Sequence, residues 1–453
     1  MPPHRRFWSR YALAASLAIP LLAVACLGST SIAAWSWMAM LSFTALAILL
    51  VGATWGAVKL PWHPILWPAT ALGALILAQY FLGWTAYAPD TLDGLLQLTA
   101  CACELYLALF AYREEANLKR AGTVLWLFSG ALGAEALAQF FTAGGYIYWY
   151  RDARYATPVG PFIYHNHFAG CMDLLLPISV AVALRVRRRS RDQPWLARVR
   201  RGILPALALT AVVVSQSRGG LFTLVFECGL AAILFAPHLR RDPRLRRRAL
   251  IGAAALVAFT LLAGWQPLLK RLANLEYHDV SAVYRARVAA ACVAIWRDHP
   301  WLGTGFNTFA QVYPRYQTFD SGQQWDQAHN EYAQALAETG LLGILVVAGF
   351  IAVLATKSWQ VNRRLKGGAA AAQFGALLGC AGFLFHSAGD FLFHAPGLSL
   401  LFFCAVGLAT APTSAGSPRL PPQASQPGNR SLAKRATTRP SAIAPQEARL
   451  RSD

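Results

Sequence analysis

Long apolar runs separated by short polar segments occupy most of the chain. About 20 consecutive apolar residues make a helix long enough to cross the hydrocarbon layer of a bilayer. Twelve runs come near this length. They cover residues 11–28, 36–57, 63–84, 91–112, 121–141, 167–184, 202–217, 219–236, 249–266, 334–356, 369–389 and 395–410. The pattern therefore predicts an all-α polytopic membrane protein with about twelve transmembrane helices.

Basic residues gather in alternate connections between these runs, and connections rich in Lys and Arg face the cytoplasm. Together with the N-terminal segment and the tail, the basic connections hold 32 of the 41 Lys and Arg residues. Both termini are therefore predicted to be cytoplasmic. The net charge of +20 then reflects topology and contact with anionic lipid, and no nucleic-acid partner is expected.

The composition supports a membrane protein and suggests three parts. Charged residues make up only 14% of the chain, whereas soluble domains carry about 25%. Residues 1–159 hold about five predicted spans, and residues 160–410 hold the others together with a large outer loop at 267–333. Residues 411–453 are rich in Pro, Ser, Ala and Arg, which predicts a disordered cytoplasmic tail.

Residues 202–236 test the predicted membrane topology, because a basic cluster flanks each end of this apolar segment. A single helix would place the two clusters on opposite sides of the membrane, so we expect the segment to fold back at residues 215–220. Arg218 then lies at the outer end of a helical hairpin, beside Gly219 and Gly220. An arginine at a helix N-terminus suits a phosphate group. The alternative is an interfacial anchor that reaches the headgroups.

The outer loop carries two more arginines, in a predicted helix at 281–298. Arg285 and Arg287 lie about 200° apart around such a helix, at 100° per residue. Only one of them is therefore expected to face a binding site, and periodicity leaves open which one.

Histidines recur at the outer ends of the predicted spans. His329 is expected to share a helical face with Tyr332, and it is either a structural residue or a general base. Asn166 and His167 precede the sixth span, and His386 with Asp390 can form an i, i+4 pair. The spacings of His and Cys do not fit a metal site or a disulfide framework, so no cofactor is expected.

Taken in order, these motifs resemble the O-antigen ligase and polymerase superfamily of bacterial envelope glycosyltransferases. The resemblance covers roughly residues 160–400 and places Arg285, not Arg287, at the position of the family's arginine. The segments that carry the resemblance are Asn166–Ala169, Ser215–Gly220, Arg285 with Trp296–Gly305, His329–Leu341 and His386–Phe391.

The resemblance implies a GT-C-like membrane enzyme that acts at the periplasmic face of the bacterial inner membrane. The donor would be a glycan on undecaprenyl pyrophosphate, and the acceptor a hydroxyl of lipid A-core. Arg218 and Arg285 would hold the pyrophosphate and His329 would deprotonate the acceptor, in an inverting reaction without a metal. The further candidates for contact with substrate are Arg287, Asn330, His167, Asn166, Tyr332 and His386.

Three other functions remain open from the sequence. A polymerase of O-antigen or exopolysaccharide would use the same donor and a growing polysaccharide as acceptor. A protein O-oligosaccharyltransferase would also use this donor. A lipid-linked glycan transporter without catalytic activity belongs to a different class.

Overall fold

A computed structural model describes residues 3–154, 156–185, 194–241, 243, 247, 280–320, 322, 324–362 and 368–412. Almost all of its regular structure is helical, and one short antiparallel hairpin pairs Tyr146 with Asp152. The elements are α1 (Pro3–Ala25), η1 (Leu27–Ser29), α2 (Ile32–Thr54), α3 (Leu66–Phe81), α4 (Ala88–Ala111), α5 (Glu115–Thr142), β1 (Tyr146–Ile147), β2 (Arg151–Asp152), α6 (His165–Arg185), α7 (Pro194–Val214), α8 (Arg218–Arg241), α10 (Val280–Asp298), α11 (Phe309–Val312), η2 (Tyr313–Arg315), α12 (Glu331–Asn362), α13 (Gly368–His386), η3 (Leu392–His394) and α14 (Pro396–Thr410).

Seven helices in the described part of the chain are long and apolar enough to cross a membrane: α1, α2, α4, α5, α6, α12 and α13. Three more apolar helices, in α3, α7 and α14, are shorter. These helices agree with a polytopic membrane protein. The prediction of twelve spans is not tested, because residues 249–266 lie outside the described residues. The same holds for residues 267–279 of the predicted outer loop and for the predicted tail from residue 413.

The predicted break in the segment 202–236 is confirmed. Helix α7 ends at Val214 and α8 begins at Arg218. Ser217 caps α8, because its Oγ accepts a hydrogen bond of 3.1 Å from the N–H of Gly220. Gln216, between the two helices, has φ of +57°.

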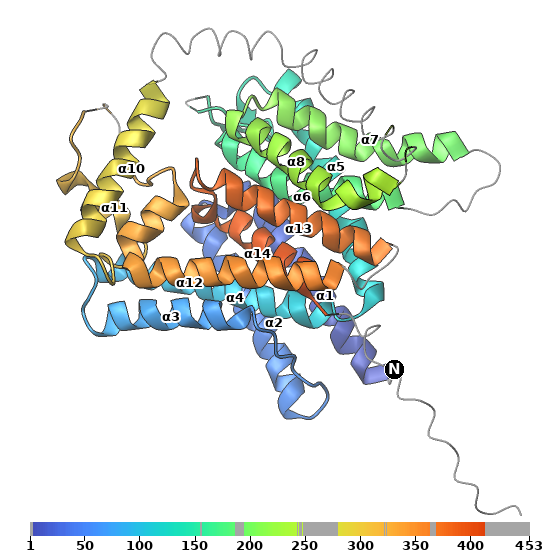
Figure 1. Ribbon diagram of the computed structural model, residues 1–453, viewed down its shortest axis with the longest axis horizontal. Helices are drawn as coiled ribbons and strands as arrows, with labels where there is room; N and C mark the ends of the chain where they lie inside the picture. Colours follow the sequence, from blue (N-terminus) through green and yellow to red (C-terminus); the bar gives the residue numbers. More distant parts are fainter. Residues whose placement is uncertain are drawn as a thin grey trace, which may run out of the picture. The chain divides into compact units, whose positions relative to one another are not determined.

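Small residues allow the central helices to approach closely. Helix α13 packs along α6 and also contacts α5, α8 and α14 (Figure 1). A Cβ at Gly375 would lie 2.5 Å from the Cα of Ile178, and one at Gly379 would lie 2.6 Å from the carbonyl oxygen of Leu174. Glycine is needed at such positions because helices inside a membrane gain stability from close backbone packing.

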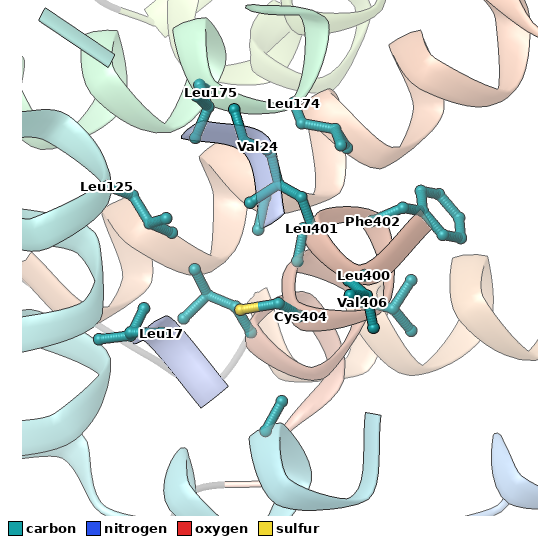
Figure 2. Close-up of a cluster of buried hydrophobic side chains, with 14 of the residues drawn as sticks. Leu17, Val24, Leu125, Leu174, Leu175, Leu400, Leu401, Phe402, Cys404 and Val406 are labelled. Carbon is teal, nitrogen blue, oxygen red and sulfur yellow. The ribbon is translucent and has the colours of Figure 1, made fainter. Parts of the chain in front are cut away.

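Helix α14 forms the middle of the hydrophobic core. It is apolar on all sides, and nearly every one of its residues is buried, as expected for a helix surrounded by other helices. Figure 2 shows its buried side chains among those of α1, α5 and α6. The labelled residues are Leu17, Val24, Leu125, Leu174, Leu175, Leu400, Leu401, Phe402, Cys404 and Val406.

Helix α12 is broken at Gly340, where φ is +60° and ψ is −162°. The loop at 300–305 fits against this break. The N–H of Leu341 donates to the carbonyl of Pro300 at 2.9 Å, and the N–H of Thr304 donates to the carbonyl of Ala337 at 3.0 Å. The loop therefore satisfies backbone groups that the broken helix cannot pair itself. These contacts fix α10 and α11 at one end of α12 (Figure 1).

We expect Gly340→Ala to destabilise the protein by about 2 kcal/mol or more. The backbone conformation at Gly340 is essentially restricted to glycine, and a Cβ there would lie 2.4 Å from the backbone carbon of Trp301. Thermal unfolding in detergent measures the effect. Gly349→Ala in the same helix is the matched control, because a Cβ at Gly349 meets nothing within 4 Å and alanine favours a helix. Equal melting temperatures for the two variants would contradict this account of the break.

Candidate functional site

Asp390 joins residues from three other segments of the chain. It follows α13, and its side chain is only 2% exposed. The amide of Asn166 donates to Oδ2 of Asp390 at 2.5 Å, and Nδ1 of His329 lies 3.2 Å from Oδ1. Nη1 of Arg285 lies 3.9 Å from Oδ2. This carboxylate thus gathers an amide, an imidazole and a guanidinium, each from a different element.

The neighbours of Asp390 keep it ionised. Burial by itself would raise the pKa of Asp390. The hydrogen bond from His329 and the positive charge of Arg285 outweigh burial, with a smaller effect from His167, so the pKa lies well below its usual value. An ionised carboxylate only accepts hydrogen bonds. The Nδ1 atom of His329 must therefore carry the proton in this pair.

A second chain of hydrogen bonds connects Asp390 with the start of α8. Ser217 donates from its hydroxyl to Oδ1 of Asn166 at 2.8 Å, while Asn166 donates from its amide to Asp390. Arg218 is the first residue of α8 and is partly exposed. The N-cap of α8 therefore places Arg218 at the same end of the helices as Arg285 and His329. A helix N-terminus beside an arginine favours an anion there.

The structure directs Arg285 and Arg287 to different places. Nη1 of Arg285 donates to the carbonyl of Gly389 at 2.8 Å, next to Asp390. The guanidinium of Arg287 instead lies 5.5 Å from the centre of the Phe319 ring. Arg285 therefore lies beside His329 and Asp390, whereas Arg287 covers an aromatic ring of the loop.

His329 does not belong to a helix, so the predicted helical face shared by His329 and Tyr332 is wrong. Helix α12 begins only at Glu331, and His329 has φ of +51°. A left-handed conformation is uncommon outside glycine and is often found at functional sites. The ring contacts Phe391 edge-on, with centroids 4.6 Å apart. The orientation of His329 is therefore set by Asp390 and Phe391 rather than by a helix.

Asn330 and Tyr332 have structural contacts next to His329. The side-chain oxygen of Asn330 accepts hydrogen bonds from the N–H groups of Tyr332 and Ala333, at 3.1 and 2.9 Å, and so caps α12. The hydroxyl of Tyr332 donates to the carbonyl of Leu384 in α13 at 2.7 Å. Both residues hold the start of α12 in place beneath His329.

His386 does not pair with Asp390, and this prediction is wrong. Helix α13 ends at His386, so the i, i+4 relation of a helix does not extend to Asp390. The Nδ1 atom of His386 lies 2.6 Å from Oδ2 of Asp173 in α6, and both side chains are buried. A Cβ at Gly219 would lie 2.3 Å from Nε2 of His386. His386 therefore packs directly under the first turn of α8.

His167 lies in the first turn of α6 and is 3% exposed. Its ring contacts those of Phe391 and Tyr164, with centroids 4.8 and 5.4 Å apart. Its Nε2 atom is buried and has no hydrogen-bond partner among the described residues. Phe391 thus lies between two imidazoles, those of His167 and His329.

Sequence reasoning missed the role of Asp390 as the common partner, and it also missed Ser217 and Asp173. A carboxylate at the end of an apolar span indicates a residue that pairs with another group, because an unpaired charge is costly there. The identity of that partner is not readable from the sequence. No group of three or more His, Cys, Asp or Glu residues in the described part of the chain is arranged to hold a metal ion.

Three residues of this arrangement lie in a segment that matches a known family. Residues 203–348 match the O-antigen ligase family model. The resemblance to the O-antigen ligase superfamily is thereby confirmed for this part of the chain. The matched range contains Arg218, Arg285 and His329, whereas Asn166 and Asp390 lie outside it.

Members of the O-antigen ligase family are glycosyltransferase-type or ligase-type membrane enzymes, and the apolar helices of this chain agree with such a protein. No curated protein matches the chain. The O-antigen ligase match and the geometry around Asp390 together indicate the function of the chain.

Proposed function

We propose that the protein is an O-antigen ligase-type glycosyltransferase. It moves a glycan from undecaprenyl pyrophosphate to a hydroxyl of lipid A-core, at the periplasmic face of the bacterial inner membrane. The observation that carries this proposal is the joint contact of Arg285 and His329 with Asp390. A cation and an imidazole are the two groups that a transfer from a diphosphate to a hydroxyl requires.

The cations serve the leaving group. During transfer, the bond between the anomeric carbon and the phosphate oxygen breaks, and its electron pair leaves with the pyrophosphate. Arg285 and Arg218 stabilise this negative charge, with the N-terminus of α8 contributing its dipole. The carbonyl of Gly389 and the carboxylate of Asp390 orient the guanidinium of Arg285 for this role.

The imidazole serves the acceptor. Asp390 accepts a hydrogen bond from Nδ1 of His329, so Nε2 is the nitrogen that takes the proton from the acceptor hydroxyl. The acceptor oxygen then forms its bond to the anomeric carbon from the face opposite the pyrophosphate, which inverts the configuration. A carboxylate that orients a histidine and stabilises its charged form works in the same way in hydrolases with a Ser-His-Asp triad.

The two arginines carry the role that a metal ion has in other transferases, so the reaction is proposed to need no metal. Arg218 and Arg285 both lie at the end of the helices where α8 begins. The distribution of basic loops supports an outward position for this end. The donor, which carries its charge at the membrane surface, then meets the arginines without crossing the bilayer.

A transfer assay with the purified protein tests this function. The protein is reconstituted with a radiolabelled lipid-linked glycan and with lipid A-core, and products are separated on a gel. We expect label on lipid A-core, with the same rate in EDTA. A rate that EDTA abolishes and a divalent ion restores contradicts the metal-free reaction.

The same assay separates the alternative functions through the choice of acceptor. Longer lipid-linked chains without lipid A-core product indicate a polymerase, and label on a protein acceptor indicates protein glycosylation. Movement of intact donor across a sealed vesicle, without transfer to any acceptor, indicates a transporter and overturns the enzymatic proposal.

A further inference from the structure

A cavity of about 480 Å³ lies beside the site described above. One face of α2 and one face of α4 form its walls, and Gln327 and Asn307 line it from loops, with His394 from η3. Its volume falls within the range of about 300–1,000 Å³ that is usual for sites of small ligands. The residues that contact Asp390 do not line this cavity themselves, but Gln327, which lies two residues before His329, does.

The cavity is polar at one end and apolar at the other. The Ser29–Ser31 turn and Ser36 lie toward the start of α2, whereas Met40 and Phe43 lie one to two turns further along. From Ile32 to Phe43 the helix extends about 17 Å, at 1.5 Å per residue. Only a third of the membrane-spanning window of α2 is buried, so the apolar end adjoins the lipid. An amphipathic ligand with its polar head at the helix start fits this gradient.

The polar end suits uncharged hydroxyl groups and not a diphosphate. Gln97, Asn307 and Gln327 contribute amides, and Asp93 contributes an exposed carboxylate. Neither Lys nor Arg occurs among the described residues that line the cavity, and a carboxylate repels a phosphate. Amides donate and accept hydrogen bonds with sugar hydroxyls, and a carboxylate accepts them. Trp35, which is mostly buried, also lines the cavity, and an aromatic ring is a suitable partner for a sugar ring.

The cavity wall is continuous with the residues that hold His329. Gln327 lies two residues before His329, so their Cα atoms are at most about 7 Å apart. His394 lines the cavity and pairs with Glu331 at 3.2 Å, two residues after His329. The amide of Gln97 donates to the carbonyl of Phe393 at 2.9 Å. A molecule held in the cavity thus contacts the segment that carries the imidazole.

We propose that this cavity binds the acceptor, through an uncharged saccharide at the head of a membrane-anchored glycolipid. The proposal rests on the transferase function given above and divides the two substrates between two places. The donor pyrophosphate binds at the arginines beside Asp390, and the acceptor sugar binds between α2 and α4.

Ser36→Trp tests the cavity by filling it. Ser36 is exposed on α2, so the larger ring enters the cavity without disturbing the core. Leu41→Trp is the matched control, because Leu41 is 43% exposed on the same helix and does not line the cavity. Both variants are compared with the unmodified protein in nanodiscs. Two measurements are made: binding of tritiated lipid A-core without donor, and the KM of each substrate during transfer.

We expect Ser36→Trp to raise the KM for lipid A-core at least tenfold, with the KM for the donor unchanged and Leu41→Trp unaffected. Binding of tritiated lipid A-core should fall in parallel. Lipid A without core sugars should bind equally to all three proteins, because the acyl tail is not the group that the cavity selects. A second variant, Asp93→Asn, removes the negative charge and replaces one acceptor oxygen with a donor group without adding volume, and it should raise the same KM severalfold.

Two results overturn the assignment of the cavity. One is a wild-type KM for lipid A-core in both cavity variants, and the other is a raised KM for the donor instead. If Ser36→Trp does not fold, the KM of the Asp93→Asn variant for lipid A-core tests the assignment instead. If the unmodified protein transfers no glycan at all, the transferase function fails. Binding of tritiated lipid A-core still tests the cavity as the acceptor site in that case. Weaker binding to Ser36→Trp supports this assignment, and unchanged binding overturns it.

Discussion

His329→Ala is expected to lower kcat for glycan transfer by about 10²- to 10⁴-fold, which corresponds to about 3–5 kcal/mol of transition-state stabilisation. The imidazole is the proposed proton acceptor, and Asp390 orients it through a contact of 3.2 Å. Alanine leaves no group at this position that can take the proton. Initial rates at saturating donor and acceptor measure the effect, and imidazole added to the buffer should restore part of the rate.

His299→Ala is the matched control for this variant. His299 lies in the same loop of the chain and is exposed at the end of α10. Its activity should stay within about twofold of the unmodified protein, since surface substitutions rarely perturb the fold. If His329→Ala transfers glycan as fast as His299→Ala does, His329 is not the base, and the proposed mechanism fails at its central residue.

Arg285→Ala is expected to lower kcat by about 10²- to 10³-fold, the usual loss when one donor to a developing anion is removed. Arg287→Ala is the closest possible comparison, because the two arginines are two residues apart in α10. Arg287 contacts the ring of Phe319, and losing such a contact costs about 0.5–1 kcal/mol of stability at an exposed site. Arg287→Ala should therefore change the melting temperature slightly and leave the rate near that of the unmodified protein.

Transfer kinetics for both arginine variants, with donor and acceptor varied separately, provide the measurement. Arg285→Lys keeps the positive charge but loses the planar group that reaches both Gly389 and Asp390. Its rate should lie between those of Arg285→Ala and the unmodified protein. A larger decrease in kcat for Arg287→Ala than for Arg285→Ala would assign the pyrophosphate to the other face of α10.

Parts of the fold that depend on local patterns were predicted correctly. The apolar runs predicted helices, and basic clusters on both sides of 202–236 predicted a break that the structure has between Val214 and Arg218. These features follow from helix length and charge, which are properties of short stretches of sequence.

Errors arose where a helical spacing was applied beyond the end of a helix. Asp390 follows the last residue of α13, and His329 precedes the first residue of α12. The i, i+4 pairing of His386 with Asp390 and the shared face of His329 with Tyr332 therefore do not exist. Helix boundaries depend on capping contacts such as that of Asn330, which are weaker signals than apolar periodicity.

The sequence by itself predicted a mostly helical chain of the polytopic membrane class, and its motifs named Arg218, Arg285 and His329 as candidates. Only the tertiary structure decided that Asp390 connects Arg285 with His329, and that Arg287 turns toward Phe319. The physical reason is that hydrophobic length and charge act along the chain, so they can be read from it. Which buried carboxylate meets which cation is decided by packing between helices far apart in sequence.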